Sequence, residues 1–241
     1  MELHVVTPGT LTQQGVIDIS VRIHPYVTAI HIREKSWTEQ QIIQTVQQML
    51  LRDIPASLIV INNHPQLALE LGVGGVHLPE FAAMYTASDC IESDNKSSTK
   101  SNHNIAQSSS LTISRSVHSV ERAWEAEQEG CHYAIFGHIY ATQSKPGVEP
   151  RGVEQLAKVC SATNMPIIAI GGIQPHHCAE LHAAGAAGIA VMSSIFTASS
   201  PLQAVQQYAD AIQHTGSAQQ AVYNKRPREM NGTTGSGIYE T

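Results

Sequence analysis

Short apolar runs rich in valine and isoleucine recur along the chain, and each has the length of a β-strand. They cover residues 3–7, 29–33, 57–62, 75–78, 111–116, 133–139, 166–170 and 188–192. Within each run the apolar residues are close to continuous instead of alternating with polar ones. This pattern is typical of parallel strands that are covered on both faces.

Helix-like segments separate many of these runs. We expect helices over residues 38–51, 119–129, 153–161, 175–184 and 201–214. The first has Thr38 as a candidate N-cap with Gln41 as its capping-box partner, and the last two begin with proline, which suits a first helical turn. Strands that alternate with helices predict parallel βα units, and eight strands favour a closed (β/α)₈ TIM barrel.

An open, doubly wound sheet is the alternative fold of the α/β class. It would be expected to carry a Gly-x-Gly-x-x-Gly sequence after the first strand, where this chain has Thr7-Pro8-Gly9-Thr10. We therefore predict one barrel domain over residues 1–214. Residues 86–110 are rich in Ser, Asn and Lys and predict a flexible insertion, and residues 215–241 predict a poorly ordered C-terminal tail.

Composition narrows the classes of partner. The chain has 241 residues, close to the usual barrel size, and its net charge of −6 gives no electrostatic basis for binding nucleic acid or an anionic membrane. The four cysteines form no Cys-x-x-Cys pair, and no apolar run approaches the roughly 20 residues of a membrane helix. We expect a cytoplasmic protein without a signal peptide, and a small-molecule ligand.

In a barrel of this kind the active site lies at the carboxyl ends of the strands. The residues with useful chemistry at those positions are Arg33, Glu34, Lys35, Asn62, Asn63, Pro79, Glu80, Ser116, His118, Gly137, His138, Lys145, Gly171, Gly172, Ser193 and Ser194. Gly171, Gly172, Ser193 and Ser194 follow the last two strands, where barrels commonly bind phosphate through backbone N–H groups. The simpler interpretation is that they form a turn and a helix cap.

Arg33 and Lys35 bring two cations to one rim, which suits an anionic ligand or a solvated pair balanced by Glu34. His138 ends an otherwise apolar strand beside a glycine, and the ordinary histidine pKa of about 6.5 suits proton transfer near neutral pH. A histidine that is merely hydrogen-bonded at the rim would give the same pattern.

The other histidines favour structural roles. His31, His77 and His118 are expected to be core or rim residues, and Cys178 with His182 has no third ligand at zinc-site spacing. We therefore predict no metal site.

Several segments together resemble the thiamin phosphate synthase/TenI family. They are His31-Ile32-Arg33-Glu34-Lys35, Val76-His77-Leu78, Ser116-Val117-His118-Ser119, Phe136-Gly137-His138, Lys145, Arg151-Gly152-Val153, Ile170-Gly171-Gly172 and the run from Gly188 to Ser193. The resemblance extends from residue 1 to about residue 212 and fails across the insertion and the tail.

Departures from the synthase pattern indicate the TenI-like branch. A synthase is expected to have Asn-Asp at Asn62-Asn63 and Gly-Gln-x-Asp at residues 79–82, and those aspartates hold Mg²⁺ on the pyrophosphate of the substrate. This chain has neither aspartate, and Mg²⁺ prefers anionic oxygen ligands. At His138 a synthase has proline, whereas TenI-like thiazole tautomerases have their acid/base histidine.

The resemblance thus implies a thiazole tautomerase that aromatises the carboxythiazole phosphate made by thiazole synthase. His138 would transfer the proton without any cofactor. Arg33, Lys35 or Lys145 would hold the carboxylate, Asn63 and Ser116 would contact the substrate, and the Gly171–Gly172 and Ser193–Ser194 pairs would bind its phosphate. A homo-oligomer is compatible with such a barrel.

Two alternatives stay open. One is a Mg²⁺-dependent thiamin phosphate synthase that uses Glu80, Asn62 and Asn63, and the other is a catalytically silent regulatory protein that binds a thiamin-related ligand.

Overall fold

The strands form one closed parallel barrel in the computed structural model, which describes residues 1–82 and 111–223 and describes side chains as far as residue 215. Each strand pairs with the next along the chain, and the last pairs with the first. The strands are β1 (Glu2–Val6), β2 (Ala29–Ile32), β3 (Ile59–Asn62), β4 (Gly75–Leu78), β5 (Thr112–Val117), β6 (Tyr133–Gly137), β7 (Ile167–Ile170) and β8 (Gly188–Val191). The predicted closed barrel is confirmed, and the open sheet is excluded.

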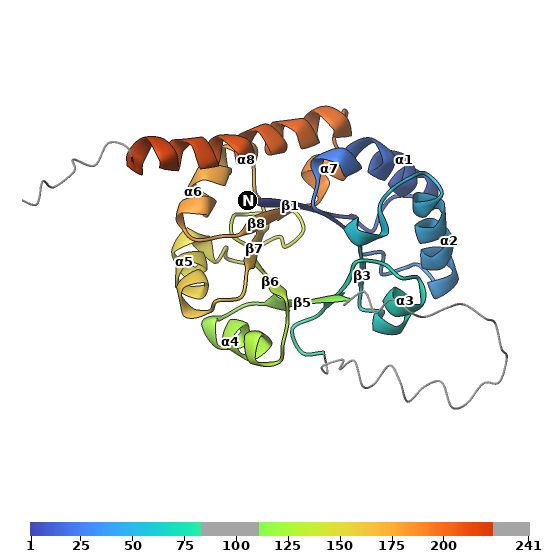
Figure 1. The fold of residues 1–241 in the computed structure, drawn as a ribbon, viewed down its shortest axis with the longest axis horizontal. Coiled ribbons are helices and arrows are strands. Elements are labelled where there is room, and N and C mark those ends of the chain that lie inside the picture. Colours follow the sequence, from blue (N-terminus) through green and yellow to red (C-terminus); the bar gives the residue numbers. More distant parts are fainter. Residues whose placement is uncertain (83–110, 224–241) are drawn as a thin grey trace, which may run out of the picture.

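Helices surround the barrel (Figure 1). They are α1 (Gln13–Ile23), α2 (Glu39–Leu50), α3 (Pro65–Glu70), α4 (Val120–Gln128), α5 (Gly152–Ala162), α6 (Cys178–Ala183), α7 (Ser193–Phe196) and α8 (Pro201–Tyr223), with 3₁₀ turns η1 (His24–Tyr26), η2 (Ala56–Leu58) and η4 (Pro175–His177). None of the helices in the described part of the chain is long and apolar enough to cross a membrane.

Local sequence signals explain several helix starts. Thr38 caps α2, and the reciprocal bond from its backbone N–H to the Gln41 side chain completes the predicted capping box. Ser119 caps α4 in the same way, by accepting from the Arg122 N–H. The segment predicted at 175–184 is η4 followed by α6, and α8 continues to Tyr223, past the predicted end at residue 214.

Two sequence predictions fall largely beyond the described residues. The predicted insertion at 86–110 lies wholly outside them, as does the segment 224–241 of the predicted tail.

The main core lies between the strands and the helices. Alternate strand residues such as Ile30, Ile32, Ile59 and Ile61 are fully buried there against α1 and α2 residues such as Val16 and Val46. A separate, smaller apolar cluster fills part of the barrel interior and consists of Val6, Ile135, Ile168 and Ala190. The interior is apolar on the side formed by β6, β7 and β8, and this leaves the opposite side for polar residues.

Candidate active site

A cavity of about 440 Å³ opens at the carboxyl ends of the strands, where a barrel is expected to bind its ligand. All of the predicted site residues except Lys35 and Asn63 line it. Those that do are Arg33, Ser116, His138, Lys145, Gly171, Gly172, Ser193 and Ser194. Residues from β2, β3, β5, β6, β7 and β8 therefore meet at one mouth.

Lys35 and Asn63 are exposed and do not line this cavity. Asn63 follows the end of β3 with a φ of 63°, and its backbone N–H donates to the His77 carbonyl. Side chains alternate across a strand, so Asn62 faces the barrel interior and lines the cavity instead. The alternation of side chains along β3 could have shown that Asn62, and not Asn63, faces the cavity.

His138 is buried in the cavity wall, with 4% of its surface exposed. Its Nε2 lies 3.2 Å from the carbonyl oxygen of Val148. Because a carbonyl can only accept a hydrogen bond, Nε2 carries the proton of the neutral ring, and Nδ1 keeps its lone pair. In the neutral ring, Nδ1 is therefore the nitrogen that can accept a proton.

The backbone around His138 is fixed by its neighbours. The Gly137–His138 peptide is cis, and Arg151 donates from Nε to the Gly137 carbonyl at 2.8 Å and from its backbone N–H to the His138 carbonyl at 2.9 Å. Gly137 has no room for a Cβ, which would overlap the Ile170 carbonyl on β7. The histidine thus sits on a tightly packed strand end.

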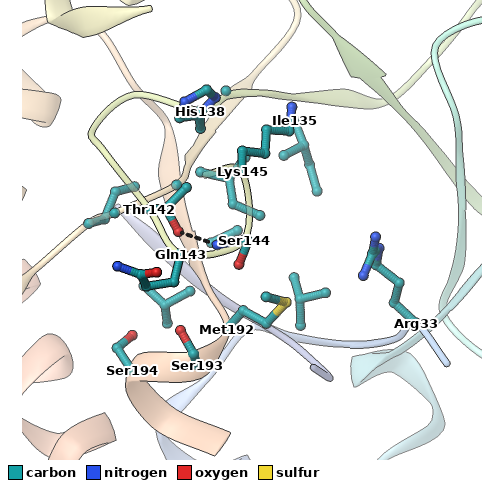
Figure 2. Close-up of a pocket in the computed structure, with 18 of the residues that line it drawn as sticks. Arg33, Ile135, His138, Thr142, Gln143, Ser144, Lys145, Met192, Ser193 and Ser194 are labelled. Carbon is teal, nitrogen blue, oxygen red and sulfur yellow. Dashed lines mark hydrogen bonds between the residues drawn. The ribbon is translucent and has the colours of Figure 1, made fainter. Parts of the chain in front are cut away.

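The glycine pair after β7 also approaches its neighbours closely. Gly171 and Gly172 have φ values of 104° and 66°, which favour glycine. A Cβ on Gly171 would overlap His138, and one on Gly172 would overlap the Ala141 carbonyl. Ser193 and Ser194 begin α7 (Figure 2) and line the same cavity as the two glycines. This end of the cavity offers backbone and hydroxyl donors, as an anion requires.

Two cations face the cavity from different elements. Figure 2 shows Arg33 and Lys145 on separate walls, with the Lys145 side chain extending toward Ile135. Lys145 lies on the connection between β6 and α5, where Thr142, Gln143 and Ser144 also line the cavity. These three were missed by the sequence reasoning, although a polar stretch directly after a strand was a usable signal.

Aromatic packing holds the start of that connection. The Tyr140 ring stacks on His177 with a centroid distance of 3.9 Å, and its hydroxyl donates to Glu180 at 2.8 Å. Burial, followed by the Glu180 contact, raises the pKa of the Tyr140 hydroxyl, so it remains a hydrogen-bond donor. Tyr140 therefore ties the connection to η4 and α6.

Histidines fill much of the polar side of the barrel interior. His31 and His77 are buried, with their ring centroids 5.6 Å apart, and His77 bonds to the Ser114 and Ser116 hydroxyls at 2.9 Å each. Burial lowers the pKa of His31 well below its usual value and lowers that of His77 to about 3. Both rings are therefore neutral. Their burial agrees with the predicted core or rim positions, and His31 also lines the cavity.

The residues at the Mg²⁺ positions of the synthase pattern do not fit that ion. Glu80 is the nearest carboxylate in sequence, but its oxygens bind His118, with Oε1 accepting from the backbone N–H at 3.1 Å and Oε2 lying 2.9 Å from Nδ1. Asn63 is exposed, and Ala82 has no donor atom in its side chain. Within residues 1–82 and 111–223, no three His, Cys, Asp or Glu side chains gather in a metal-binding group.

Comparison with known proteins identifies relatives over most of the chain. Residues 3–195 match the family model described as thiamine monophosphate synthase (TMP-TENI). Thiamine-phosphate synthase of Natronomonas pharaonis is 32% identical over 206 residues, which cover 81% of this chain and 86% of the relative. That of Xanthomonas campestris pv. campestris is 28% identical over 212 residues, which cover 86% of this chain and 93% of the relative.

Solved structures agree with the fold. Thiamine phosphate pyrophosphorylase from Pyrococcus furiosus superposes with a TM-score of 0.67 at 24% identity, over 89% of this chain and 96% of that one. The 3-hexulose-6-phosphate synthase of Salmonella typhimurium superposes with a TM-score of 0.65 at 15% identity, over 89% and 100%. The matched segments and the barrel coincide, and the chain belongs to the thiamine monophosphate synthase (TMP-TENI) family.

Proposed function

We propose that this protein is a thiazole tautomerase of thiamin biosynthesis, which aromatises a carboxythiazole phosphate. The observation that carries the proposal is the state of His138. It lines the cavity, and its bond to the Val148 carbonyl leaves Nδ1 as a base. The positions that hold acidic metal ligands in the synthase pattern carry Asn63 and Ala82 instead.

The cavity matches such a substrate in polarity. The glycine turn Gly171–Gly172 and the Ser193 and Ser194 hydroxyls would bind the phosphate, and Arg33 or Lys145 would bind the carboxylate. Between these ends, the apolar side chains of Ile135 and other residues of β6 to β8 would contact the ring.

His138 would carry out the proton transfer. Tautomerisation removes a proton from the ring carbon and adds one to the exocyclic carbon, so no redox change occurs. Aromaticity favours the product, and one positioned acid/base group contributes about 10²- to 10⁴-fold to such a rate. His138, placed by the Gly137 and Gly171 contacts, supplies this group directly or through a relay.

A second candidate is the condensation carried out by the named relatives, which are thiamine-phosphate synthases. That these relatives are named as synthases supports the condensation as the activity of this protein. The Mg²⁺ that it requires finds no suitable set of ligands at Asn63, Glu80 and Ala82, because the only carboxylate among them is bound to His118.

The first test follows aromatisation of the thiazole tautomer by ultraviolet absorbance. His138→Asn removes a group that can take up a proton, so we expect kcat to fall about 10²- to 10⁴-fold. His24→Asn is the matched control, because His24 also bonds a backbone carbonyl, that of Val21, but lies on η1. An unchanged rate for His138→Asn would remove His138 from the mechanism.

The second test separates the two candidate functions. The wild type is incubated with Mg²⁺ and both phosphorylated precursors, and thiamin phosphate is measured. We expect no turnover, and sustained turnover would establish the synthase activity in place of the tautomerase.

A further inference from the structure

The connection between β6 and α5 turns back and bonds to the strand end from which it starts. Arg151, the residue before α5, donates from its Nε to the Gly137 carbonyl at 2.8 Å and from its backbone N–H to the His138 carbonyl at 2.9 Å. The next N–H, that of Gly152, donates to the Ile139 carbonyl at 3.1 Å. Three successive carbonyls of the strand end therefore accept from Arg151 and Gly152.

Arg151 holds both peptide groups that flank the Cα atom of His138. The Gly137 carbonyl belongs to the peptide group before this atom, and the His138 carbonyl belongs to the one after it. Because each peptide group is planar, bonds to both of them limit rotation about the two backbone dihedrals of His138. Those dihedrals set the direction of the Cα–Cβ bond. The direction in which the imidazole ring leaves the backbone therefore depends on Arg151.

The same returning segment also holds the His138 ring. Val148, three residues before Arg151, lies with its carbonyl oxygen 3.2 Å from His138 Nε2. That bond leaves Nδ1 as the nitrogen that can accept a proton in the neutral ring. Only two residues separate Val148 from Arg151, so a shift of Arg151 away from the strand end would also loosen the bond to the ring.

The contacts of the Arg151 side chain are directed to the strand end and not to its own helix. Arg151 is the N-cap residue of α5, but its side chain makes no capping bond. Arg151 is exposed, whereas Gly137 and His138 are buried. A buried backbone carbonyl requires a hydrogen-bond partner, and Arg151 Nε supplies one to Gly137. An exposed residue thus completes the bonding of a buried strand end.

We propose that Arg151 is the positioning residue of His138, which it keeps in the orientation that bonds Nε2 to Val148 and leaves Nδ1 as the base. The inference rests on the proposed tautomerase function, and it deepens that function by naming the residue on which the base depends. Arg151 is not among the residues that line the cavity. It therefore acts on the rate of proton transfer and not on the binding of the phosphate or the carboxylate.

Two substitutions separate the donor at Nε from the rest of the side chain. Glutamine carries its amide nitrogen at the same number of bonds from the backbone as arginine Nε, so Arg151→Gln keeps a donor for the Gly137 carbonyl. Methionine has a methyl group at that position, so Arg151→Met keeps the length without the donor. Arg52→Met is the matched control, because the Arg52 guanidinium also donates, to Asp18 at 2.7 Å, but on the exposed surface.

The kinetics of aromatisation test the role in turnover. In Arg151→Met we expect kcat to fall at least about tenfold while KM changes less than about threefold, because a displaced base slows proton transfer and leaves the binding groups in place. Arg151→Gln should recover most of kcat, and Arg52→Met should behave as the wild type. Wild-type kcat in Arg151→Met, or equal losses in Arg151→Met and Arg151→Gln, overturns the proposal.

The tautomer of His138 gives a second test that does not depend on turnover. Long-range ¹⁵N–¹H NMR of the ¹⁵N-histidine-labelled protein at about pH 8, where histidine is ordinarily neutral, shows which nitrogen carries the hydrogen. His138→Asn assigns the signals by their loss. We expect the hydrogen at Nε2 in the wild type and in Arg151→Gln, and a mixture of tautomers in Arg151→Met. The wild-type pattern in Arg151→Met overturns the proposal.

Arg151 is exposed, so we expect these variants to fold, and urea unfolding checks this. If Arg151→Met does not fold, Arg151→Lys takes its place, because lysine keeps the charge but carries its nitrogen one bond further from the backbone. A higher kcat in Arg151→Lys than in Arg151→Gln then overturns the proposal. Absence of aromatisation in the wild type overturns the tautomerase function instead, and the NMR tautomers then decide the role of Arg151 alone.

Discussion

Gly171 lies against His138 where two neighbouring strands leave the barrel. Its φ of 104° suits glycine, and a methyl group at this position would overlap the His138 side chain. The absence of a side chain at residue 171 is therefore part of what places the histidine in the cavity wall.

We predict that Gly171→Ala lowers both stability and tautomerase activity. Gly130→Ala is the matched control, because Gly130 has a φ of 83° but no atom within 4 Å of the added methyl group. The control should cost about 1 kcal/mol in the free energy of unfolding, from backbone conformation alone. Gly171→Ala should cost more and reduce kcat, which urea unfolding and the absorbance assay measure. Equal losses in the two variants would show that the contact with His138 has no role.

We selected candidate site residues from the carboxyl ends of the predicted strands, and most of the selected residues line the cavity. His138, Gly171 and Ser193 all line the cavity. Asn63 and Lys35 do not line it, because the inward-facing residue at the end of β3 is Asn62, and Lys35 lies in the exposed turn after β2. His31 was predicted to be a core or rim residue, and it is buried and also lines the cavity.

At the scale of single elements, the capping box of α2 is the clearest local signal in the chain. The Thr38 hydroxyl accepts from the Gln41 N–H at 3.3 Å, and the Gln41 side chain accepts from the Thr38 N–H at 2.8 Å. These bonds satisfy backbone donors that the first helical turn leaves without partners. α2 packs against α1, and its residues Ile42, Val46 and Met49 belong to the main core.

We predict that Thr38→Ala destabilises the protein by about 1 kcal/mol. Ser36→Ala, two residues earlier at another exposed position, should change stability by less than about 0.5 kcal/mol. Urea unfolding of both variants measures the difference. If Ser36→Ala costs as much as Thr38→Ala, the capping bonds are not the cause.

The elements that the sequence did not predict have weak local signals. α1 contains Gly15 and several β-branched residues, although Val16, Ile17 and Ile23 follow helical spacing and are buried. α3 and α7 have six and four residues, which is too short for a periodicity to be recognised. All eight strands were predicted because most of their apolar runs are dense and are separated by polar or helix-like segments.

For the whole molecule, the buried neutral histidines couple stability to pH. His31 and His77 have folded-state pKa values below their usual value, with that of His77 at about 3. The unfolded chain therefore binds protons that the folded protein does not bind. Their contribution is complete above about pH 6.5 and is lost as the pH falls below it.

We predict that the free energy of unfolding falls between pH 6.5 and 5 by about 1.4 kcal/mol per pH unit for each of these histidines. The carboxyl groups with lowered pKa values, such as Glu2 and Asp18, act mainly below this window. Urea unfolding at several pH values measures the slope, and His77→Asn should reduce it by about half. A slope that is the same in His77→Asn and in the wild type would contradict the assignment.

In this barrel, the residues that stabilise the fold are largely separate from the residues that line the cavity. The large core lies outside the strands, while the interior cluster has only Val6, Ile135, Ile168 and Ala190 at its centre. Interior side chains near the mouth are thus free to change without loss of the shell that supports them. In evolutionary terms, such a barrel can exchange one chemistry for another by a few substitutions at its mouth, while the core outside the strands stays unchanged.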